Sequence, residues 1–207
     1  NANSRPDSNG FPTKVEIAIY VLDIEQIDNL RHEFTCDFLV VMRWKDPRLA
    51  ADERKESIED IWSPNIEVLN GRNLSELFPK NVEIDKEGNV LYRQRYYGNM
   101  ACQLDLKRFP FDTQFLPISL VSIGFTPEEI DLSFNADRSG RMEQITSSDW
   151  DIGNGEGNSS VFKTYSSGAN RVEYARPMVK YVFTAKRHIF FYLWKVILPL
   201  LIIVFMS

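Results

Sequence analysis

Among the side chains that could do acid–base or nucleophilic chemistry, this chain has many acids but only two histidines and two cysteines. His32 stands beside an expected turn and His188 at the edge of an apolar segment, so neither is expected to belong to a Ser-His-Asp or Cys-His triad. No HExxH, CxxC or P-loop pattern occurs, and the glycine-rich stretch 153–157 lacks the Lys-Ser/Thr that phosphate binding needs. We therefore expect that the protein is not an enzyme.

Calcium is the one cofactor that the acids of this chain could bind. Hard cations take several oxygen ligands from flexible loops, so a cluster of carboxylates in a loop-rich stretch could hold calcium. The candidate cluster is Asp137, Glu143, Asp149 and Asp151. Solvated surface acids are the favoured alternative, and we expect no cofactor unless these four residues bind calcium.

The two cysteines, Cys36 and Cys102, both stand in apolar, strand-like runs. Two small buried thiols are the favoured interpretation. A single disulfide is the alternative, and it requires that the strands carrying the two residues are neighbours.

The segment Phe109-Pro110-Phe111-Asp112 suits docking rather than bond chemistry. It places two aromatic rings around a proline turn and ends on an acid. An apolar knob with one charge, held on a loop, fits contact with an apolar partner.

An apolar partner is indicated by residues 188–207, which are typical of the start of a transmembrane helix. Lys186 and Arg187 precede aromatic residues at 190–194, and the aliphatic run 196–204 follows, which is the order expected at a bilayer boundary. The apolar stretch has the minimum length of a span, about 18 residues, although Lys195 interrupts it. A buried core helix or a C-terminal strand is the alternative.

The rest of the chain, residues 1–187, is expected to form one all-β domain. Short runs rich in β-branched and aromatic residues alternate with turns, which predicts an antiparallel, immunoglobulin-like β-sandwich of about ten strands. The stretch from Gly153 to Ser160, rich in Gly, Asn and Ser, is expected to be a loop. The expected strands are 15–24, 34–44, 61–66, 82–84, 90–104, 113–123, 130–134, 150–152, 160–165 and 172–186.

The charge of the chain argues against a nucleic-acid partner. The net charge is -5, and lysines and arginines are interleaved with acids. No basic stripe is present that could displace the counterions of a phosphate backbone.

Five features occur in an order that is similar to one known family. They are Trp44-Lys-Asp46, Trp62-Ser-Pro64, the loop 102–116 with its Phe-Pro-Phe-Asp core, Arg187 and Pro199. With these features the chain resembles one subunit of a pentameric ligand-gated ion channel (the Cys-loop receptor superfamily), from the extracellular domain to the start of the first membrane helix. Leu116 stands where animal members have the second cysteine of the loop, and no adjacent cysteine pair occurs near 165–174, so the chain is similar to the prokaryotic branch.

The resemblance implies a homopentamer in the cell membrane, with the lipid bilayer as a partner and the extracellular domain in the periplasm of a bacterium. Agonist binding between subunits would open a transmembrane pore. Two rivals remain: a soluble ligand-binding homologue without a channel, and an unrelated adhesion β-sandwich with a membrane anchor. The apolar run 196–204 argues against the first, and the loop together with Arg187 argues against the second.

The resemblance also implies a ligand site under a capping loop at the subunit interface. The residues that align with this site are Leu69, Ile123, Phe125, Tyr165 and Tyr174. Only some are aromatic, so the cage that an ammonium ligand prefers is partial. We therefore expect a proton, a small amine or another small molecule as agonist, while strand packing is the alternative role for each tyrosine.

Coupling between this site and the pore is implied for Asp112 and Arg187, which the family brings together. A bidentate Arg–carboxylate pair is directional, so it can transmit a tilt of the sandwich to the helix. Breaking a buried pair costs about 3–5 kcal/mol, whereas breaking an exposed pair is nearly neutral. Asp28 is a candidate second acid, with Asn29 as an equally good alignment. Pro110 and Phe111 complete the expected coupling set.

Overall fold

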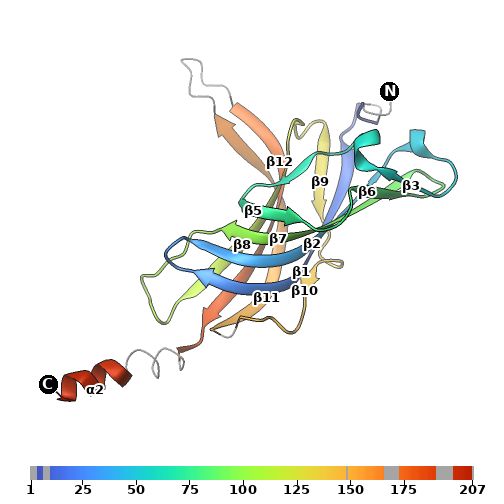
Figure 1. The fold of residues 1–207 in the computed structure, drawn as a ribbon. Helices are drawn as coiled ribbons and strands as arrows, with labels where there is room; N and C mark the ends of the chain where they lie inside the picture. The colour runs from blue at the N-terminus through green and yellow to red at the C-terminus, as the bar shows by residue number, and fades with distance from the viewer. Residues whose placement is uncertain (1–3, 7–9, 148, 166–172, 190–197, 207) are drawn as a thin grey trace.

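The computed structural model describes residues 4–6, 10–147, 149–165, 173–189 and 198–206. Within these ranges the chain forms twelve strands in two sheets, and Figure 1 shows their arrangement. The predicted β-sandwich is confirmed.

The larger sheet has eight strands. They are β1 (Thr13–Asp28), β2 (Glu33–Lys45), β3 (Arg54–Ser57), β5 (Gly71–Glu76), β6 (Asn81–Ile84), β7 (Asn89–Ala101), β9 (Ile130–Phe134) and β10 (Gly140–Arg141). Their order is β10-β1-β2-β7-β6-β3, with β5 paired to β7 and β9 paired to β1. The pairs of β1 with β9 and β10 are parallel, and the other strand pairs of this sheet are antiparallel.

The smaller sheet has four strands in the order β11-β12-β8-β4, all antiparallel. They are β4 (Ile66–Val68), β8 (Thr113–Ser122), β11 (Trp150–Tyr165) and β12 (Glu173–Arg187). Two short 3-10 helices, η1 (Pro47–Leu49) and η2 (Ile58–Asp60), lie in the connections on either side of β3.

The core lies between the two sheets because each sheet has one apolar face. In β2 the side chains alternate between buried and half-buried, as expected for a strand with its apolar residues facing inward. Phe38 from the larger sheet and Phe183, Leu116 and Ile118 from the smaller one are fully buried. Leu116, at the position of the missing second cysteine, therefore packs in the core.

Both cysteines are free and buried, which confirms the prediction of two buried thiols. Cys36 pairs with Gly98 across β2 and β7, while Cys102 follows the end of β7. Burial raises the pKa of Cys36 well above its usual value and that of Cys102 to about 11.

The expected loop at 153–160 is wrong, because these residues belong to β11, which pairs with β12 from Gly155 onward after a register shift between Ile152 and Gly155. The glycines are present for close packing rather than for a turn. A Cβ at Gly157 would overlap the ring of Phe134, and a Cβ at Gly155 would lie 2.5 Å from Cζ of Tyr181. The two rings lie 5.3 Å apart and cover this part of the strand.

Helix α2 (Leu198–Met206) is the described part of the segment expected to enter the membrane, and residues 190–197 of that segment lie outside the described residues. No helix among the described residues is both long and apolar enough to cross a bilayer.

The turn between β1 and β2 and the segment that links β7 to β8 lie at one end of the sandwich. Figure 1 shows that β12 ends at this same end of the sandwich. The expected coupling residues come from these three segments.

Candidate functional site

Arg187 and Asp112 form a buried, bidentate ion pair. Nε of Arg187 donates to Oδ1 of Asp112 at 2.8 Å, and Nη2 donates to Oδ2 at 3.0 Å. Only 4% of the Arg187 side chain and 2% of the Asp112 side chain are exposed. The backbone N–H of Arg187 also donates to the carbonyl of Asp112. The pair that the resemblance implied is therefore formed between the end of β12 and the residue before β8.

Gln114 holds the Asp112 carboxylate from the other side. Its Nε2 donates to Oδ2 of Asp112 at 2.5 Å and to the carbonyl of Asp105 at 2.8 Å, while its Oε1 accepts from the Asp105 N–H at 2.9 Å. Burial by itself raises the pKa of Asp112, but the hydrogen bonds from Arg187 and Gln114 outweigh burial and lower this pKa below its usual value. Asp112 is therefore held as a carboxylate.

Two aromatic rings contact the guanidinium of Arg187. Its Cζ lies 4.0 Å from the ring centroid of Trp150 and 5.0 Å from that of Phe109. Trp150 is buried at the start of β11, so part of the attraction occurs away from water. The guanidinium of Arg187 thus pairs with a carboxylate along one edge and also lies over two aromatic rings.

The turn between β1 and β2 joins this cluster through Asn29, whose Oδ1 accepts a hydrogen bond of 3.3 Å from Nη2 of Arg187. The carboxylate of Asp28 instead accepts from the backbone N–H groups of Leu30 and Arg31. These two hydrogen bonds lower the pKa of Asp28. Of the two alignments that the sequence left open, the structure brings Asn29 into the cluster, and Asp28 shapes the turn.

The other two expected coupling residues lie at the surface of the same loop. Pro110 is half-buried and follows a cis peptide bond, and 68% of Phe111 is exposed. Phe111 is therefore available for contact with another apolar surface, whereas Phe109 contacts Arg187.

Sequence reasoning missed Gln114 and Trp150. Gln114 stands two residues after Asp112, and this spacing places both side chains on the same face of a strand, which is the signal that could have indicated it. For Trp150 no comparable signal exists, because it reaches Arg187 only through the pairing of β11 with β12.

We refer to Asn29, Asp112, Gln114, Trp150 and Arg187 as the Arg187 cluster. It joins the β1–β2 turn, the β7–β8 segment and the ends of β11 and β12.

The five expected ligand-binding residues come from three places around the smaller sheet. Leu69 follows β4, and Ile123 and Phe125 follow β8, where the N–H of Ile123 donates to the carbonyl of Asn65. Phe125 packs edge-on against Trp62, with 5.7 Å between ring centroids. Because β4 and β8 are antiparallel, Ile123 lies beside the start of β4, whereas Leu69 lies beside Ser119 at the other end of β4.

The two tyrosines lie on the β11–β12 hairpin, and each is 49% exposed. Tyr174 pairs with Thr164, so Tyr165 and Tyr174 face opposite sides of the hairpin. Residues 166–172, between them, lie outside the described residues. The structure therefore places one tyrosine on each face, and the expected site remains a prediction.

The four candidate calcium ligands gain no support. Glu143 and Asp151 line a small cavity of about 150 Å³ together with Arg141 and His188, so two basic groups accompany the two acids. Within the described ranges, no group of three or more His, Cys, Asp or Glu side chains is placed to hold a metal ion.

Comparison with known proteins places the chain in a family. Residues 1–189 match the family model described as the neurotransmitter-gated ion-channel ligand binding domain. A proton-gated ion channel from Gloeobacter violaceus is 28% identical over 204 residues, which are 95% of this chain and 55% of the relative.

Two animal proteins are also similar. The gamma-aminobutyric acid receptor subunit theta of Mus musculus is 32% identical over 144 residues, 64% of this chain and 23% of the relative. The subunit beta-4 of Gallus gallus is 29% identical over 137 residues, 61% of this chain and 28% of the relative. The match thus spans about half or less of each of these relatives. Because the family model covers nearly the whole chain, the chain belongs to the neurotransmitter-gated ion-channel ligand binding domain family.

Proposed function

We propose that this chain is the ligand-binding part of a subunit of a ligand-gated ion channel. Agonist binding changes the arrangement of the sandwich, and the loop 102–116 and Arg187 carry this change to a transmembrane pore. The observation that carries the proposal is the buried pair of Arg187 and Asp112, formed at the end of β12.

The geometry of the Arg187 cluster suits transmission of a mechanical change. A bidentate pair fixes both the distance and the direction between its partners. Arg187 is the last residue of β12, so a rotation of β8 or β12 moves the chain that follows. Because the pair is buried, a change in its geometry is energetically expensive, and the connected segments move together.

The assembly and the agonist belong to the same proposal. Five copies of the chain form a homopentamer in a cell membrane, with residues 1–187 outside the bilayer and, in a bacterium, in the periplasm. The agonist is a proton or a small molecule that binds between subunits near the five expected ligand-binding residues. The names of the relatives support this range, since one is a proton-gated channel and two are gamma-aminobutyric acid receptor subunits.

The test is an electrical recording of the full-length subunit in oocytes, with pH steps and a panel of small amines as stimuli. Arg187→Ala and Asp112→Ala each leave a buried charge without its partner, so we expect channels that reach the surface but do not open. The matched control is Lys80→Ala, which breaks an exposed pair with Glu76 and is expected to conduct normally. Unchanged currents in both Ala variants contradict the proposal.

A further inference from the structure

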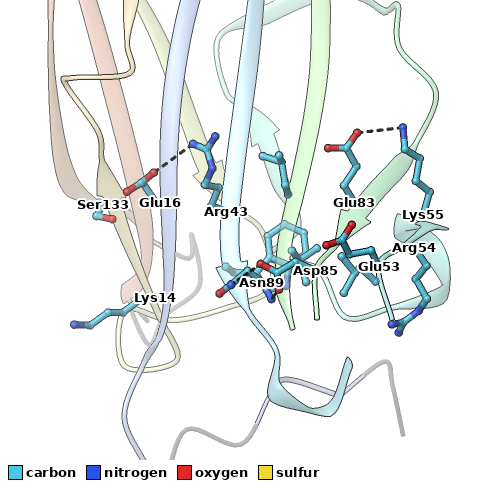
Figure 2. A pocket seen from close by; sticks show the side chains of 14 residues that line it. Lys14, Glu16, Arg43, Glu53, Arg54, Lys55, Glu83, Asp85, Asn89 and Ser133 are labelled. Atoms are coloured by element: carbon cyan, nitrogen blue, oxygen red, sulfur yellow. Dashed lines mark hydrogen bonds and ion pairs between the residues drawn. The ribbon is translucent and has the colours of Figure 1, made fainter. Parts of the chain in front are cut away.

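A pocket of about 810 Å³ lies on the larger sheet, lined mostly by outward-facing side chains together with the core residues Trp44, Ile84 and Val90. Figure 2 shows its labelled side chains, which come from β1, β2, β3, β6, β7, β9, the segment before β3 and the turn after β6. Its volume is within the range of small-molecule sites, roughly 300–1,000 Å³. None of the five ligand-binding residues lines it. It is therefore a separate place on the molecule, which we call the mixed-charge pocket.

The strand register builds one row of side chains across this pocket. Glu16 pairs with Arg43, Arg43 with Leu91, Leu91 with Glu83, and Glu83 with Lys55. The neighbours of these residues along each strand, such as Val15 and Val90, are buried in the core, so the row faces outward. Arg43 lies 3.5 Å from Glu16, and Lys55 lies 3.2 Å from Glu83.

Leu91 separates the two ion pairs and gives the middle of the pocket an apolar surface. Figure 2 shows Lys14, Glu16 and Arg43 on one side and Glu53, Lys55 and Glu83 on the other. Arg43 and Glu83 are two strand spacings apart, roughly 9.5 Å at the backbone. Arg43, which can bind a carboxylate, and Glu83, which can bind an ammonium group, thus face solvent on either side of Leu91.

The charges of the lining select against a ligand of a single sign. Four basic side chains (Lys14, Arg43, Arg54 and Lys55) and four acidic ones (Glu16, Glu53, Glu83 and Asp85) line the pocket. An anion or a cation alone meets as much repulsion as attraction there, whereas a zwitterion can place each end against an opposite charge. Within the described part of the chain, Lys14 and Glu53 form no ion pair, so both charge signs are available.

The ion pairs of the row do not close the pocket to a ligand. The side chains of Arg43 and Glu16 are 35% and 38% exposed, and those of Lys55 and Glu83 are 71% and 41% exposed. Glu83 is also paired with Arg93 at 2.8 Å, and the Arg93 side chain is 42% exposed. Exposed pairs of this kind contribute little stability, so exchanging a partner for a ligand group costs little.

We propose that the mixed-charge pocket binds a long-chain zwitterion of the ω-amino acid class. The carboxylate lies against Arg43, the apolar chain over Leu91 and the ammonium against Glu83. The inference concerns a site on the larger sheet and does not require that the channel opens.

The test is calorimetric titration of the purified full-length protein with ε-aminocaproate. Three control compounds isolate the three parts of the proposal: caproate lacks the ammonium, hexylamine lacks the carboxylate, and glycine has both charges without the apolar chain. Saturable binding is expected for ε-aminocaproate alone. Binding of caproate or hexylamine with the same affinity overturns the zwitterion assignment, and the absence of saturable ε-aminocaproate binding overturns the site.

Two variants locate the binding. Arg43→Gln and Glu83→Gln each remove one charge contact, and each is expected to weaken binding about tenfold, which corresponds to roughly 1.4 kcal/mol. Lys86→Gln is the matched control, because Lys86 is exposed in the turn after β6 and does not line the pocket. If Lys86→Gln weakens binding as much as Arg43→Gln, the ligand binds elsewhere and the proposal is wrong. Thermal unfolding of each variant verifies that it is folded.

Calorimetry also separates this inference from the proposed function. Binding of ε-aminocaproate without agonist-evoked currents supports the pocket and contradicts the channel proposal. Agonist-evoked currents without ε-aminocaproate binding support the channel proposal and contradict the pocket.

Discussion

At the scale of single residues, the structure explains how a buried arginine is tolerated at the end of a strand. Arg187 has a carboxylate, an amide oxygen and two aromatic faces around its guanidinium. Asp112 in turn accepts hydrogen bonds from both Arg187 and Gln114. A buried ion pair is stable only when its remaining donors and acceptors also have partners, and the cluster supplies them.

The lowered pKa of Asp112 predicts how acid affects stability. Because this pKa is lower in the folded chain than the usual 3.8, the unfolded chain takes up the proton first as the pH falls. The pair therefore contributes its full stability above about pH 4 and loses it as the pH falls through the lowered pKa.

Thermal unfolding of the full-length protein as a function of pH measures this effect, with Asp112→Asn as the comparison. The wild-type melting temperature should fall more steeply below pH 3.8 than that of the variant, which lacks the titrating group. Parallel profiles would show that Asp112 does not contribute in this way.

Part of the cluster could be predicted from the sequence and part could not. Arg187 and Asp112 were indicated by a resemblance that rests on short motifs around them. Asn29 was one of two alignments that the resemblance left open, and the path of the turn decides between it and Asp28. Trp150 reaches Arg187 only through the pairing of β11 with β12. No local pattern carries that information.

At the scale of elements, apolar alternation predicted the long central strands correctly, as in β2 and β8. It failed where side chains are polar or absent. Strands β3 and β5 are short and mostly polar, and they pair at the margin of the sheet. The glycine-rich part of β11 resembles a loop because its packing partners, Phe134 and Tyr181, lie on other strands.

This account of β11 predicts the effect of a single methyl group. Gly157→Ala places a Cβ against the Phe134 ring, and overpacking of this kind costs about 1–3 kcal/mol. Chemical denaturation of the full-length protein measures the loss. Asn158→Ala, at an exposed neighbouring position, is the control and should change stability by less than about 0.5 kcal/mol.

A smaller side chain at position 134 provides a second check. If the ring of Phe134 causes the loss, Gly157→Ala should cost less in a Phe134→Leu background, since residues in contact are not additive. Equal costs in both backgrounds would refute the packing explanation.

At the scale of the whole molecule, the two sheets are associated with different proposed sites. The five expected ligand-binding residues lie on or next to strands of the smaller sheet, and the mixed-charge pocket lies on the larger sheet. The Arg187 cluster joins segments of both sheets at the end of β12. The sandwich and its family were predictable from the sequence. The pocket was not, because its row of charges is assembled by the register of five strands.

The central claim is that the Arg187–Asp112 pair couples the sandwich to the pore. A double-mutant cycle on agonist-evoked currents tests it most directly, using Arg187→Gln, Asp112→Asn and the double variant in the full-length channel, with surface expression measured in parallel. If the two residues act as one unit, each single change impairs opening and the double variant is no worse than either single variant. Independent, additive effects of the two changes, or normal currents in either single variant, would contradict the account.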